Sequence, residues 1–103
     1  MRFLAEDRIA SEIAEEIKCN FDYSNRIGQF EFDYEIELDD EVLYIEGRMI
    51  YEVKYEEDVN YAYISYASID ISNALAYDGY GDETKFEYNV NKIEEYIKNY
   101  LTE

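Results

Sequence analysis

The chain has 103 residues, enough for one domain but not for two. Its 26 acidic residues outnumber the 9 basic ones and give a formal net charge of −17, which opposes direct binding of nucleic acid or anionic lipid and favours basic partners. Hydrophobic residues make up 48% of the chain, too large a share for a disordered acidic tail, so we expect a folded domain.

The residue types that are missing exclude several chemistries. Without His the chain cannot form a Ser-His-Asp triad and lacks the commonest zinc ligand. Cys19 is the only cysteine, which excludes an intrachain disulfide and suits a reducing compartment; we expect it to be a small buried apolar residue. No apolar run is long enough for a signal peptide or a membrane span. We therefore expect a cytoplasmic protein without membrane association, cofactor or enzymatic activity.

Residues 3–18 are predicted to form an amphipathic helix. Apolar residues recur at the helical period along one stripe and acidic residues lie opposite. The stripe consists of Phe3, Ile9, Ala10, Ile13, Ala14 and Ile17. A turn-rich segment, residues 20–28, ends this helix.

Strict alternation of apolar and acidic residues over 29–38 predicts the first strand. A polar turn at 39–41 and renewed alternation over 42–55 predict a hairpin, in which pairing Leu38 with Leu43 places both apolar faces on the same side. Gly47 interrupts the second strand and indicates a bulge or a close approach of two backbones.

A third strand is predicted over residues 60–72, after a turn at 56–58. Its inward face is expected to carry Tyr61, Tyr63, Ser65, Ala67, Ile69 and Ile71. A glycine turn at 78–83 precedes a possible short fourth strand at 84–89. The last helix is predicted over 90–101, with Asn91 as its cap and Glu94 completing a capping box.

This order of elements predicts an α+β fold. We expect residues 1–103 to form a single domain in which an antiparallel meander of three to four strands carries an N-terminal and a C-terminal helix packed on one face.

The acidic face of the first strand is the sharpest functional feature of the sequence. Residues two apart on a strand lie about 6.6–6.8 Å apart, which is close to the separation of successive phosphates along a nucleic-acid strand. One hypothesis is that this face mimics nucleic acid and blocks a basic site on a host nucleic-acid-binding protein. The simpler interpretation is a solvent-facing strand whose charges keep it soluble and protect an edge. The residues of this acidic row are Glu31, Asp33, Glu35 and Glu37.

A second hypothesis concerns apolar residues expected on the same face of the sheet. They predict a contact with a partner or a small homo-oligomer, unless residues 72–81 fold across that face and cover them. The predicted patch consists of Tyr44, Ile50, Ile64 and Tyr66.

Acidic turns offer a third, weaker hypothesis. In a meander the first and third turns meet at one end of the sheet, which would bring Asp39, Asp40 and Glu41 near Asp78, Asp82 and Glu83. Oxygen ligands of this kind suit calcium, but the segment lacks the spacing of an EF-hand loop, so we expect no metal site.

The runs EGRMIYEVKYEED and YISYASIDI, followed by an acidic glycine turn and a short helix, resemble small acidic uncharacterised proteins of bacteriophages and mobile elements of gut Bacteroidetes. The resemblance covers about residues 45–101. It implies a protein that binds and blocks a host protein, and it assigns no site residues.

Overall fold

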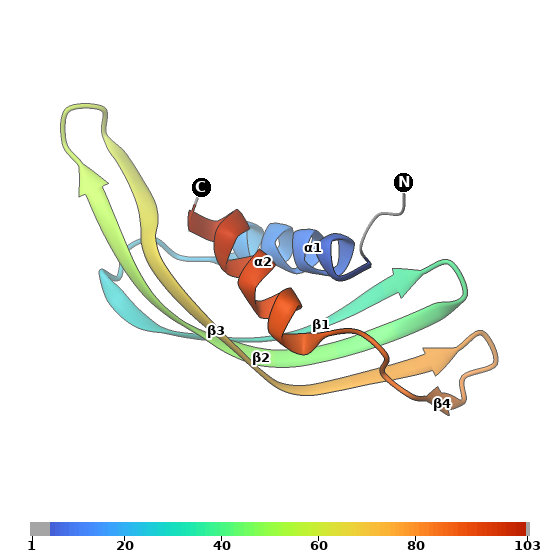
Figure 1. Cartoon of the computed structure of the whole chain (residues 1–103). Helices are drawn as coiled ribbons and strands as arrows, with labels where there is room; N and C mark the ends of the chain where they lie inside the picture. The colour runs from blue at the N-terminus through green and yellow to red at the C-terminus, as the bar shows by residue number, and fades with distance from the viewer. Residues whose placement is uncertain (1–4, 103) are drawn as a thin grey trace.

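The computed structural model describes residues 5–102, so Phe3 of the predicted helical stripe lies outside the described part. Figure 1 shows the order of the elements. They are α1 (Ala5–Asn20), β1 (Ile27–Leu38), β2 (Glu41–Glu56), β3 (Tyr61–Asp78), β4 (Glu83–Thr84) and α2 (Val90–Thr102).

The strands form one antiparallel sheet in the order β1-β2-β3-β4, so each strand lies beside its neighbour in the chain. Both helices lie on the concave face of this curved sheet (Figure 1). The predicted α+β meander with two helices on one face is confirmed. The fourth strand is shorter than expected, because only Glu83 and Thr84 pair with β3 before the chain leaves the sheet.

The core lies between the helices and the concave face of the sheet. The predicted apolar stripe of α1 is buried from Ile9 to Ile17, and α2 contributes three buried side chains. Each isoleucine buried in this way stabilises the fold by about 1.5–3 kcal/mol. The largest fully buried side chains are Ile9, Ile13, Ile17, Leu43, Ile45, Met49, Ile93 and Ile97.

Cys19 is exposed, which corrects the expectation that it would be buried. It lies two residues after the buried Ile17, and two helical residues turn through roughly 200°. The Cys19 side chain therefore leaves the helix on the side away from the core.

The register of the first hairpin is two residues tighter than predicted. Leu38 pairs with Glu41, and Leu43 pairs with Ile36. Because a shift of two residues keeps every side chain on its own face, the predicted inward and outward faces of β1 and β2 still hold.

Two bulges in β3 change the faces of that strand. Ser65 and Ser72 are each left without a partner on β2, and each serine hydroxyl donates a hydrogen bond to a β2 carbonyl, of Glu52 and Glu46 respectively. Ala67 and Ile69 face the core as predicted, whereas Ile64 replaces Ser65 as an inward residue. A bulge adds one residue and so reverses the alternation beyond it.

Gly47 lies beside the bulge at Ser72, which confirms the predicted close approach. A Cβ atom built on Gly47 would lie 2.6 Å from the carbonyl oxygen of Asp70 and 2.8 Å from Cζ of Phe32. The strand therefore has no room for a side chain at this position.

The cap of α2 is Asn89, not the predicted Asn91. The Asn89 side chain accepts a hydrogen bond from the backbone N–H of Lys92 at 3.1 Å, the usual geometry of an N-terminal cap. Glu94 also has a different role from the one predicted. Its carboxylate accepts the backbone N–H of Ile71 at 2.8 Å and so ties α2 to β3.

Candidate functional site

The sheet face away from the helices, here called the outer face, is the main candidate surface. Within residues 5–102 no element covers it, because both helices lie on the opposite face (Figure 1). The alternative in which residues 72–81 fold across this face is wrong. Most of that segment continues β3 to Asp78, where it pairs with β2.

The acidic row lies along the outer face of β1, and all four of its side chains are exposed. The strand β1 is the first in the sheet order and therefore an edge strand. The alternation of buried and exposed residues along β1 places the four carboxylates on one face, about 6.8 Å apart from one to the next. The structure thus brings the predicted row together as expected.

The neighbours of the acidic row on β2 do not neutralise it. Asp33 lies directly opposite Glu46, so two like charges face each other. Glu31 lies opposite Arg48, but the guanidinium of Arg48 forms an ion pair with Asp70 on β3 at 3.8 Å. Within the described residues, none of the four carboxylates of the row forms an ion pair.

A shallow depression lies beside the row at the centre of the outer face. It extends across β1, β2 and β3 beside Gly47 and the bulge at Ser72. Its charged lining consists of four acidic residues and one basic residue, which gives this part of the face a negative potential. The charged residues are Glu31, Asp33, Glu46, Arg48 and Asp70.

The predicted apolar patch does not form as one surface. Ile64 is only 3% exposed and belongs to the core, because the bulge at Ser65 turns it inward to pair with Val53. Tyr44 is exposed on the outer face but lies six residues along β2 from Ile50, a distance of about 20 Å.

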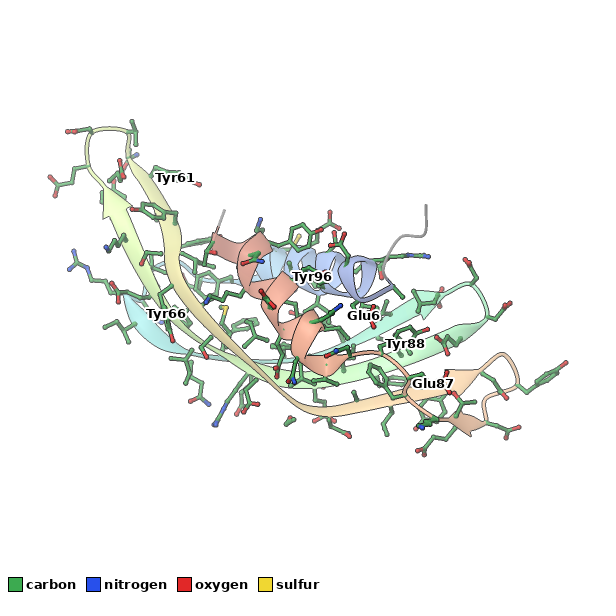
Figure 2. The ribbon with its side chains drawn as sticks, viewed as in Figure 1. Glu6, Tyr61, Tyr66, Glu87, Tyr88 and Tyr96 are labelled. Atoms are coloured by element: carbon green, nitrogen blue, oxygen red, sulfur yellow. The ribbon has the colours of Figure 1, made fainter. Side chains whose placement is uncertain are left out.

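What remains of the patch is two separate apolar sites. At one end Tyr44 packs edge-to-face on Tyr77 with their ring centroids 5.5 Å apart. At the other end Ile50 and Tyr66 are 46% and 51% exposed, and Figure 2 shows Tyr66 on the side of the sheet away from the helices.

Sequence reasoning missed Ile27, which joins the second of these sites. Ile27 is 72% exposed and pairs with Glu52. This pair lies two positions along the strands from the pair of Gln29 and Ile50, and therefore on the same outer face. The alternation that defines β1 extends back through Gln29 to Ile27, and this signal could have found it.

The first and third turns do lie together, as predicted, because Glu41 pairs with Asp78. The carboxylate of Asp78 is already used within its own turn, where it accepts the backbone N–H groups of Tyr80 and Asp82 at 2.9 and 3.0 Å. Among residues 5–102 no group of three or more acidic or Cys side chains is placed to hold a metal ion.

Tyr88, which lies just before α2, contacts β2 at this end of the sheet. Its hydroxyl donates a hydrogen bond to the Glu41 carboxylate. Burial, followed by this hydrogen bond and the negative charge of Glu41, raises the pKa of Tyr88 to about 12. Figure 2 shows the positions of Tyr88 and of Glu6, whose carboxylate accepts the backbone N–H of Asn89 at 3.0 Å. These contacts hold the start of α2 in place and give Glu41 and Glu6 a structural role.

No protein-family model, curated protein or solved structure matches the chain. Within the described residues, no helix is long and apolar enough to cross a membrane.

Proposed function

We propose that this protein is a non-enzymatic module that binds a basic protein partner through the acidic outer face of its sheet. In the sharpest form of the proposal, the acidic row takes the place of nucleic-acid phosphates in a basic site of a nucleic-acid-binding protein and blocks it.

One observation carries the proposal: the acidic row is exposed on an uncovered face and has no ion-pair partner among the described residues. Four carboxylates in line at about 6.8 Å span about 20 Å, which matches the reach of several successive phosphates on one nucleic-acid strand. Carboxylates held on a strand keep this spacing before binding, so a basic site meets them without ordering a flexible chain.

The alternative function is a structural or oligomeric role through the apolar end of the outer face. The exposure of Ile27, Ile50 and Tyr66 favours it, since isolated surfaces seldom leave three neighbouring apolar side chains this open. Two copies of the chain, each with a net charge of −17, repel each other, and this repulsion opposes self-association. The two functions differ in salt dependence, because ionic strength weakens an electrostatic contact and leaves an apolar one largely unchanged.

The proposal is tested by pull-down from a bacterial lysate with a competition step. We expect the tagged protein to retain a discrete basic protein that is released by added DNA or RNA and by rising salt. The variant in which the acidic row is neutralised (E31Q, D33N, E35Q and E37Q) should lose this protein.

A matched variant separates the row from total charge. This control variant changes the net charge by the same four units at exposed positions away from the acidic row. The neutralised residues are Glu15, Glu57, Asp58 and Glu95. Equal loss of binding in both variants would show that net charge alone is responsible. Retained protein that nucleic acid cannot displace would contradict the mimic and leave a general basic partner.

A further inference from the structure

The backbone of β1 offers a second kind of binding group beside the acidic row. The carbonyl oxygen of Arg26 accepts the N–H of Val53 at 2.6 Å, which makes these two residues a hydrogen-bonded pair of the antiparallel ladder. Such pairs alternate with pairs whose N–H and C=O groups point away from each other. Because the register runs without a shift from Ile27 to Leu38, the odd-numbered residues of β1 direct their backbone groups to the open edge.

Contacts on the far side of β2 agree with this assignment. The carbonyl groups of Glu46 and Glu52, which lie opposite Asp33 and Ile27, point toward β3 and accept the serine hydroxyls of its bulges. Their partners on β1 must therefore point the other way, toward the open edge.

The open edge and the acidic row consist of the same residues. Glu31, Asp33, Glu35 and Glu37 place their side chains on the outer face and their backbone N–H and C=O groups at the edge. Within residues 5–102 no other segment forms a hydrogen bond with these edge groups. The sequence has no Pro, and β1 has no bulge, so the two backbone devices that usually block an edge are missing.

We propose that the open edge of β1 takes up an extended segment of another protein, in which Lys or Arg alternates with other residues, as a fifth strand of the sheet. This inference rests on the proposed function and names the form of the partner. In an antiparallel pairing, the residues opposite the acidic row form hydrogen-bonded pairs with it and direct their side chains to the same face. Each basic side chain then lies about 4.5–5.5 Å, between Cβ atoms, from a carboxylate of the row.

Charge also decides which strand fits. A second copy of this chain would place one acidic row against another, and like charges directly opposite destabilise a pair of strands. An apolar strand would leave the four carboxylates unpaired. An alternating basic strand satisfies the backbone groups and the carboxylates at the same time.

Three peptides of identical charge test the inference. The first alternates Lys with Thr over nine residues and begins and ends with Thr. The second carries N-methyl groups on the backbone nitrogens of its Lys residues, which removes the N–H groups that point to β1. The third carries the same number of N-methyl groups on its Thr residues, whose N–H groups point away from β1. Binding is measured by titration of the isotope-labelled protein at low ionic strength, together with amide exchange at the four row positions.

We expect the first and third peptides to bind within about threefold of each other and to slow amide exchange at the acidic row. The second peptide should bind at least tenfold more weakly, and so should the first peptide to the protein with the row neutralised. If the second peptide binds as tightly as the first, the fifth strand is refuted while the acidic face remains a binding surface. If neutralising the row does not weaken binding of the first peptide, both proposals fail. If the first peptide does not bind at all, the fifth strand is refuted, and the pull-down from lysate alone decides the proposed function.

Discussion

Replacing Gly47 with Ala should test the close approach of β1, β2 and β3 around this residue. The added Cβ would lie 2.6 Å from the carbonyl oxygen of Asp70, 2.8 Å from Cζ of Phe32 and 3.1 Å from Cα of Ile71. Two of these atoms belong to the backbone of β3 and cannot move without shifting the strand. Overpacking of this kind costs about 1–3 kcal/mol. The smaller entropy of the unfolded Ala chain offsets about 0.4–1 kcal/mol of that cost.

The midpoints of these two ranges leave a net loss of about 1.3 kcal/mol in the free energy of unfolding for Gly47→Ala. For a domain of this size this corresponds to a fall of about 5–10 °C in Tm. Urea unfolding followed by circular dichroism measures the loss, provided that the m value is unchanged.

Gly79→Ala is the matched control, because a Cβ at Gly79 would meet nothing within 4 Å. It should leave stability within about 0.5 kcal/mol of the wild type or raise it slightly. The reasoning fails if the two variants are equally stable, since both exchange the same residue types and differ only in what surrounds the new methyl group.

Three further predictions concern the cap of α2, the pKa of Tyr88 and the burial of Ile64. Asn89→Ala should cost about 1 kcal/mol in urea unfolding through loss of the cap of α2, whereas Asn91→Ala should cost less than half of that; equal losses would contradict the assignment of the cap. Stability should fall as pH rises from 10 toward 12, because folding raises the pKa of Tyr88 to about 12 and the folded chain keeps a proton that the unfolded chain loses. Glu41→Gln should lower this pKa in a spectrophotometric tyrosine titration, and an unchanged pKa would refute the role of Glu41. Ile64→Ala should cost about 2–4 kcal/mol because Ile64 is buried, and a surface-like cost below 0.5 kcal/mol would return it to the outer face.

The fold could be predicted where the local pattern and the tertiary structure agree. Strict alternation over residues 29–38 fixed the faces of β1, and the helical stripe from Ile9 to Ile17 is buried as expected. Even the error of two residues in the hairpin register changed no face, because the side-chain period of a strand is two.

The errors in the predicted faces of the strands lie where the backbone departs from that period. No apolar pattern marks Ser65 or Ser72 as an extra residue, because a small hydroxyl side chain suits either face of a sheet. The bulge at Ser65 then turned Ile64 from the predicted patch into the core. Gly47 was the only sequence signal near either bulge, and it lies on the neighbouring strand.

The bulges also decide which part of the candidate site could be predicted. The acidic row lies on β1, which has no bulge, and all of it is found where the sequence placed it. The apolar patch depended on the register between β2 and β3, which two bulges alter, and it separates into two ends. A surface that lies within one strand can be predicted from alternation alone, whereas a surface that crosses strands requires a register that the sequence does not specify.

The acidic side chains and the unpaired backbone groups belong to the same residues of β1. The open edge therefore has opposite effects on two kinds of approaching strand. Toward another copy of the chain, the acidic row repels any strand that would pair with the edge. Toward an alternating basic strand, the same carboxylates attract and also set the register, because a slip of one residue would turn the basic side chains to the opposite face. Ionic strength separates the contribution of the ion pairs from that of the backbone hydrogen bonds, because salt screens exposed ion pairs and leaves backbone hydrogen bonds largely unchanged. Binding of such a strand should therefore weaken with salt to a residual level, whereas binding through charge alone should vanish.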